Sequence, residues 1–126
     1  MPRPYNKKVV AVVSDLFFAA KINEAAKRAG VTVEYVVDHE KVLERADSQP
    51  GVIIFDLNLE SADPLGLIGK LKENPHWKTI SLIAFVPHVQ GELRQEAQKR
   101  GCDLVLPRSS FSMNLTQILK RHAGAV

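Results

Sequence analysis

The 126-residue chain has a single cysteine, few aromatic residues and no long hydrophobic run. With Cys102 alone, no disulfide can form within the chain, and a thiolate-based metal cluster is not expected. No stretch approaches the roughly 20 apolar residues that a membrane-spanning helix needs. No hydrophobic signal segment precedes the first strand-like run. These absences favour a cytoplasmic protein that does not enter a membrane.

Motifs of several common enzyme classes are also missing. Neither a G-x-G-x-x-G motif nor a P-loop follows any strand-like segment, which argues against nucleotide binding. The four histidines are scattered without the spacing of metal ligands, and no nucleophile elbow supports a hydrolase. We therefore expect a protein that is not an enzyme.

The charge of the chain is only mildly basic, with 17 lysines and arginines against 14 acidic residues. This excess is far smaller than the dense basic patch typical of nucleic-acid-binding proteins. Basic residues become more frequent towards the C-terminal end, and that part of the surface would suit an acidic partner.

Strand-like and helix-like segments alternate along the chain. The expected strands are residues 8–14, 32–37, 51–55, 80–86 and 104–107. The expected helices are residues 17–29, 39–46, 64–73, 90–100 and 111–122. Asp38 and Asp63 are expected N-caps, and Gly30 is expected to end the first helix.

Two of the expected strands, residues 51–55 and 80–86, are almost continuously apolar, as in parallel strands that are buried on both faces. Right-handed crossover helices supply that cover. The pattern predicts a single α/β domain over residues 1–126, with a flavodoxin-like, doubly wound (βα)5 fold. This fold is a three-layer sandwich around a five-stranded parallel sheet in the order 2-1-3-4-5.

Asp56 closes the apolar run 51–55 and should therefore lie at the carboxyl end of the central strand. In open α/β sheets, binding sites are built at this edge. Asp15 follows the first strand and Arg108 follows the fifth, so both are expected at the same edge. We predict that Asp15, Asp56 and Arg108 form an ion cluster in which Arg108 pairs with Asp56 and takes the electrostatic place of a metal ion.

Four segments together resemble the receiver domain of two-component response regulators, the CheY-like family. They are Val12-Val13-Ser14-Asp15, Phe55-Asp56-Leu57, Asp63-Pro64-Leu65-Gly66 and Gly101-Cys102-Asp103-Leu104-Val105-Leu106-Pro107-Arg108. The resemblance covers essentially the whole chain and implies a role in bacterial signal transduction. It places the phosphoacceptor position at Asp56 and implies a Mg²⁺ site formed by Asp15 and Asp56.

The chain departs from this family at the positions that bind the metal and transmit the signal. Ser14 replaces the first acidic residue, and because a hydroxyl adds no negative charge, the affinity for Mg²⁺ should fall. The switch positions correspond to Val86, which has no hydroxyl, to Val105, which replaces Tyr or Phe, and to Arg108, which replaces Lys. The resemblance therefore implies a degenerate member, a pseudo-receiver that the standard phosphorylation relay does not regulate.

Two other functions stay open. In the first, the chain is an active single-domain response regulator that is phosphorylated on Asp56 with Mg²⁺. In the second, it is a small-ligand-binding flavodoxin-like domain without phosphoryl chemistry. The second function predicts a roomy apolar pocket at the strand ends, whereas a receiver predicts a shallow acidic one.

No output domain is expected, because only four residues follow His122. A signal would then leave through a protein partner, either a histidine kinase or a downstream signalling protein. The resemblance implies a contact surface on the fourth helix, fifth strand and fifth helix, where the candidate residues are Arg94, Arg108 and Lys120. A homodimer through this face is a further expectation, whereas nucleic acid and membranes are not expected partners.

Overall fold

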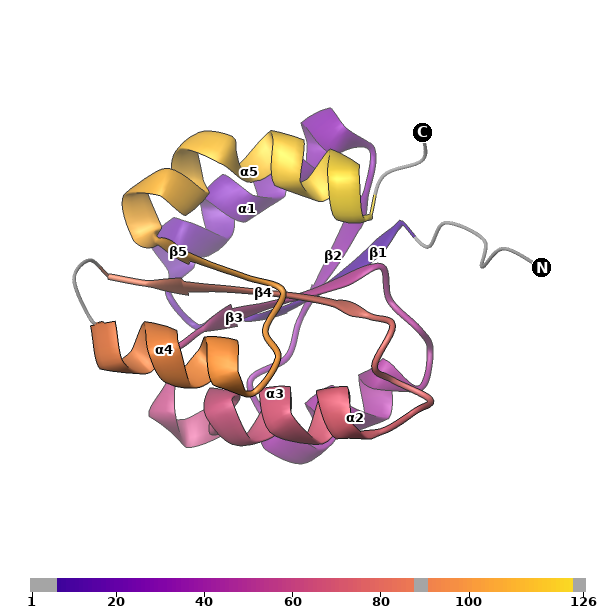
Figure 1. Cartoon of the computed structure of the whole chain (residues 1–126). Coiled ribbons are helices and arrows are strands. Elements are labelled where there is room, and N and C mark those ends of the chain that lie inside the picture. Colours follow the sequence, from indigo (N-terminus) through magenta and orange to yellow (C-terminus); the bar gives the residue numbers. More distant parts are fainter. Residues whose placement is uncertain (1–6, 88–90, 124–126) are drawn as a thin grey trace.

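The computed structural model describes residues 7–87 and 91–123, which form a parallel sheet between two layers of helices (Figure 1). The sheet has five strands in the order β2-β1-β3-β4-β5, and neighbouring strands are parallel. The strands are β1 (Lys8–Val12), β2 (Thr32–Tyr35), β3 (Val52–Asp56), β4 (Ser81–Val86) and β5 (Leu104–Pro107). The predicted flavodoxin-like order is confirmed.

Helices cover both faces of the sheet: α1 and α5 lie on one face, and α2, α3 and α4 lie on the other (Figure 1). The helices are α1 (Leu16–Ala29), α2 (His39–Ala46), α3 (Pro64–Glu73), α4 (Gly91–Lys99) and α5 (Arg108–His122), with a short 3-10 helix η1 (Glu60–Ala62). Within the described part of the chain, no helix is both long enough and apolar enough to cross a membrane.

The core has two halves because side chains of a strand alternate between its faces. Val9 and Ala11 of β1 pack with the helices α1 and α5, whereas Val10 and Val12 pack with α2, α3 and α4. Every residue of β3 is buried, since this central strand is covered on both faces. Burial on both faces explains why its sequence is a continuous apolar run rather than an alternating one.

The predicted helix ends are confirmed at three positions. The Asp38 carboxylate accepts a hydrogen bond of 3.2 Å from the N–H of Glu40, and Asp63 accepts one of 3.2 Å from the N–H of Gly66. Gly30 ends α1 in the left-handed conformation with φ 72°. These local signals could be read from the sequence because each depends only on neighbouring residues.

Several predicted boundaries were wrong. Strand β1 ends at Val12 rather than at residue 14, because Asp15 already caps α1, which begins one residue later. Strand β2 likewise ends at Tyr35 rather than at residue 37. Helix α5 begins at Arg108 rather than at residue 111, because Pro107 leads directly from β5 into the first helical turn. The 3-10 helix η1 was not predicted.

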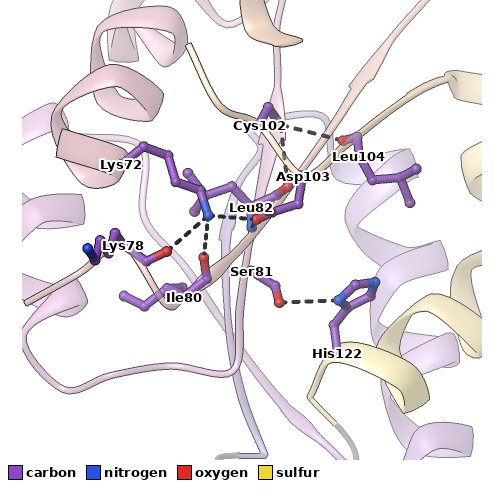
Figure 2. Close-up of polar contacts among 9 residues, drawn as sticks. All are labelled: Lys72, Lys78, Ile80, Ser81, Leu82, Cys102, Asp103, Leu104 and His122. Atoms are coloured by element: carbon purple, nitrogen blue, oxygen red, sulfur yellow. Dashed lines mark hydrogen bonds and ion pairs between the residues drawn. The ribbon is translucent and has the colours of Figure 1, made fainter. Parts of the chain in front are cut away.

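The amino ends of β4 and β5 are joined to α3 by Lys72 (Figure 2). Its Nζ donates to the carbonyls of Lys78 and Ile80 at 3.1 and 3.2 Å and pairs with Asp103 Oδ2 at 2.9 Å. The same oxygen of Asp103 accepts the N–H of Leu82 at 2.7 Å. This network lies at the amino ends of the strands, whereas Asp56 lies at the carboxyl end of β3. Its role is therefore structural.

Candidate functional site

The carboxyl ends of the parallel strands bring the predicted site residues to one edge of the sheet. Asp56 is the last residue of β3, and Val86 is the last residue of β4. Ser14 and Asp15 follow β1, while Arg108 follows β5 as the first residue of α5. The predicted common edge for Asp15, Asp56 and Arg108 is therefore confirmed.

Asp56 is a buried carboxylate with one local hydrogen bond. Its side chain is part of a residue that is only 7% exposed, and its Oδ1 accepts the N–H of Asn58 at 2.9 Å. Burial raises the pKa of Asp56 above its usual value, since desolvation disfavours the charged form. The hydrogen bond from Asn58 and the charge of Arg108 oppose this shift, whereas the charge of Asp15 adds to it.

The predicted ion pair between Arg108 and Asp56 is not formed. The ion pairs within residues 7–87 and 91–123 all involve other residues. The guanidinium carbon of Arg108 lies 5.4 Å from the ring centroid of Phe18 and 5.7 Å from that of Phe85. The aromatic cluster formed by these two rings and Phe111 attracts the cation through its π faces. Arg108 thus rests on aromatic rings rather than on a carboxylate.

Asp15 has a local role that was not predicted from the sequence. Its Oδ1 accepts the N–H of Phe17 at 2.9 Å and the N–H of Phe18 at 3.2 Å, so the carboxylate is the N-cap of α1. Asp15 and the preceding Ser14 are both exposed, in contrast to Asp56. The two carboxylates at this edge therefore differ in solvation as well as in hydrogen bonding.

The residues at this edge offer few free oxygen donors for a Mg²⁺ ion. This ion prefers octahedral oxygen coordination with one or two carboxylates. Asp15 caps a helix, Asp56 is buried, Ser14 adds no charge, and the guanidinium of Arg108 acts on Asp56 from nearby. Within the described part of the chain, no group of three or more His, Cys, Asp or Glu side chains is placed to hold a metal ion.

The residues at the two apolar switch positions are part of the core. Val86 and Val105 are each only 2% exposed and belong to the half of the core that α2, α3 and α4 cover. Neither side chain has a hydrogen-bonding group, so neither can bind a phosphoryl oxygen. An aromatic switch residue would move between a buried and an exposed position. Val105 is packed in the core and has no such exposed position.

The three candidate residues for partner binding lie in different environments. Arg94 on α4 and Lys120 on α5 are exposed, and neither takes part in an ion pair with another described residue. Arg108 is only partly exposed, and its guanidinium lies against Phe18 of α1. Arg108 therefore faces the neighbouring helix α1, whereas Arg94 and Lys120 are open to solvent.

A cavity of about 540 Å³ opens beside this edge, between the first turns of α1 and α5 and the end of β4. Its lining residues are Asp15, Phe17, Phe18, Lys21, Pro87, Arg108, Ser109 and Ser112. Asp56 is not among them. The cavity is mostly apolar and roomy, as expected of a small-ligand site, and it is separate from the position of Asp56, where a receiver would have its acidic pocket.

The cavity residues of α1 were not predicted from the sequence, although a signal was present. Leu16, Phe17 and Phe18 are three consecutive large apolar residues at a helix start, and a helix can bury only one of its faces. Phe18 is 4% exposed, but Phe17 is 68% exposed and Leu16 is 86% exposed. Consecutive apolar residues at the first turn of a helix thus marked an apolar surface beside the site.

No protein-family model and no curated protein matches the chain. Many solved structures are similar to it. A receiver domain from Bermanella marisrubri has a TM-score of 0.79 at 20% identity, over 93% of this chain and 98% of the other. The chemotaxis response regulator CheY4 of Vibrio cholerae has a TM-score of 0.75 at 22% identity, over 90% and 96%.

The receiver domain of the sensor histidine kinase PA1611 from Pseudomonas aeruginosa PAO1 has a TM-score of 0.77 at 20% identity. This match covers 95% of this chain and 99% of the other, whose structure holds a magnesium ion in its active site cleft. The strand order of this chain is the one predicted for a flavodoxin-like fold. The chain therefore has the CheY-like fold of the response regulator receiver domain.

Proposed function

We propose that this chain is a pseudo-receiver, a signal-transduction domain that acts through protein–protein contact and is not regulated by the standard Mg²⁺-dependent phosphorylation relay. The observation that carries the proposal is the position of Arg108. Its guanidinium rests on the rings of Phe18 and Phe85, beside an edge where Asp15 caps α1 and Asp56 is buried. The receiver fold supports the signalling role.

The chemistry of phosphoryl transfer supports the same conclusion. A carboxylate that attacks a phosphoryl group must be charged and accessible, and a metal ion must offset the charge on the phosphoryl oxygens. Asp56 is 7% exposed and its pKa is raised by burial. A phosphoryl group on Asp56 would also meet no hydroxyl at Val86. These features oppose both the formation of an acyl phosphate and its use as a conformational signal.

The partner that suits the chain is an acidic protein, either a histidine kinase or a downstream signalling protein in the cytoplasm. Arg94 on α4 and Lys120 on α5 are exposed cations without an ion-pair partner among the described residues. An acidic partner surface would neutralise these cations. A homodimer through the same face is a further proposal.

The phosphorelay part of the proposal is tested with the full chain. Mg²⁺ is titrated by calorimetry, the protein is then incubated with acetyl phosphate, and the intact mass is measured. We expect no heat of metal binding and no mass gain, with Asp56→Asn behaving like the natural chain. A phosphate-sized mass gain that disappears in Asp56→Asn would overturn the proposal and support an active phosphoacceptor.

A restoration experiment tests the physical reason. The double variant with Ser14→Asp and Arg108→Lys adds a carboxylate where the resemblance places the first acid and removes the planar guanidinium. We expect it to gain Mg²⁺ affinity, because two adjacent carboxylates near Asp56 attract a hard cation. The matched control combines Arg108→Lys with Gln117→Glu, which adds an acid at an exposed position of α5. Equal Mg²⁺ affinities in both double variants would contradict the argument.

A further inference from the structure

The cavity between the first turns of α1 and α5 has the properties of a small-molecule site. Its volume of about 540 Å³ lies within the roughly 300–1,000 Å³ that is typical of small-molecule pockets. Phe17, Phe18 and Pro87 give it apolar walls. Phe17 and Phe18 belong to α1 and Pro87 follows β4, so the cavity exists only in the folded chain.

Arg108 brings an unpaired cation to the wall of this cavity. Its Nε is buried and has no hydrogen-bond partner among the described residues. The guanidinium also takes part in no ion pair there, since the ion pairs of the described chain involve other residues. A buried donor without an acceptor is unfavourable, and it gains most from a ligand that supplies an acceptor. A guanidinium binds carboxylate and phosphate groups with two parallel hydrogen bonds.

The other polar groups of the cavity also favour an anion. Lys21 lines it, with Nζ 5.4 Å from the ring centroid of Phe17. Asp15, the single acidic residue among the described lining residues, already accepts two backbone N–H groups through Oδ1. The hydroxyls of Ser109 and Ser112 add donors, and the first turn of α5, which has no side-chain cap, lies at the same wall.

The aromatic surface defines the rest of the ligand. The ring of Phe17 belongs to a residue that is 68% exposed at the cavity, and Phe18 lies beside it. Exposed aromatic faces stack well against flat apolar groups. We propose that this cavity binds a small organic anion with a flat apolar body, of which an aromatic carboxylate is the simplest form. This inference goes beyond the proposed protein-contact function, because it uses neither Asp56 nor the surface that carries Arg94 and Lys120.

The experiment uses 2-naphthoate as the probe and 2-naphthamide as its neutral counterpart, with binding measured by calorimetry. We expect 2-naphthoate to bind with one-to-one stoichiometry and the amide to bind at least about tenfold more weakly, because it lacks the charge that Arg108 and Lys21 attract. Arg108→Met should weaken naphthoate binding by about tenfold or more, while Met keeps contact with the aromatic rings. Lys21→Met should weaken it by a smaller factor, since Lys21 is exposed.

The matched control is Arg94→Met, which removes the same charge from an exposed position that does not line the cavity. We expect its affinity for 2-naphthoate to be unchanged. Phe17→Ala changes a mostly exposed side chain and should weaken the probe and the amide alike. If Arg108→Met does not fold, Lys21→Met and Phe17→Ala decide the matter.

Three outcomes would overturn the inference. The first is the absence of naphthoate binding at millimolar concentration. The second is equal affinity for the anion and its amide. The third is equal loss of affinity in Arg94→Met and in the cavity variants, which would indicate a general charge effect. None of these outcomes depends on phosphorylation of Asp56, so the cavity and the proposed signalling function are tested separately.

Discussion

The two glycines of α3 should respond differently to the same substitution. Gly66 and Gly69 both lie inside this helix, where replacement of Gly by Ala is favoured by about 1 kcal/mol. A Cβ at Gly69 would meet no atom within 4 Å. A Cβ at Gly66 would collide with the carboxylate of Asp63, whose Cγ would be 2.8 Å away. The difference arises because Asp63 caps α3 through the N–H of Gly66.

The magnitudes follow from these contacts. Gly69→Ala should raise the free energy of unfolding by about 0.5–1 kcal/mol, through the lower entropy of the unfolded chain and better helix propensity. Gly66→Ala gains a similar amount, but the Asp63 carboxylate must leave its capping position, which costs about 0.5–2 kcal/mol. The two variants should therefore differ by about 0.5–2 kcal/mol, with Gly66→Ala the less stable of the two.

The assay is urea unfolding followed by far-ultraviolet circular dichroism, with the slope of each transition compared between variants. The same two substitutions are repeated in an Asp63→Gly background. This background removes the carboxylate and suits the left-handed φ of 50° at that position. There, the two alanine variants should become equally stabilising. Equal effects in the natural background, or a difference that persists without Asp63, would refute the reasoning.

Three further perturbations test other parts of the structure. Asp56→Asn removes a buried charge but keeps an acceptor for Asn58, so the free energy of unfolding at pH 7 should rise by about 1 kcal/mol. The pKa of Asp56 is raised in the folded state, so the stability gained from Asp56→Asn should shrink as the pH falls through the pKa values of folded and then unfolded Asp56. A stability gain that is independent of pH would contradict the raised pKa. Burial raises the pKa of the Cys102 thiol to about 12, so a disulfide reagent at pH 8 should modify the native chain far more slowly than the urea-unfolded chain, and equal rates would disprove its burial. Lys72→Met breaks the network in Figure 2 and should lower the free energy of unfolding by about 2–3 kcal/mol, whereas Lys120→Met, at an exposed position, should change it by less than about 0.5 kcal/mol.

The sequence by itself determined the architecture of the protein. The apolar runs at 51–55 and 80–86 are long enough and continuous enough to require cover on both faces, and this requirement leads to a parallel sheet between two helical layers. Asp38 and Asp63 could be recognised as helix caps because capping depends on residues two or three positions apart. The location of Asp56 followed in the same way, since it directly ends a buried strand.

Only the tertiary structure decided which groups interact at the edge of the sheet. Arg108 could reach a carboxylate or an aromatic cluster, and the choice depends on how Phe18 and Phe85, which are far apart in sequence, meet beneath it. From the sequence, Asp15 could ligate a metal ion or cap a helix. In the structure α1 begins directly after Asp15, and the carboxylate caps this helix. The cavity has the same origin, because its walls come from α1, α5 and Pro87, which follows β4. Local patterns specify elements, whereas partners and cavities depend on side chains that only the packing of those elements brings together.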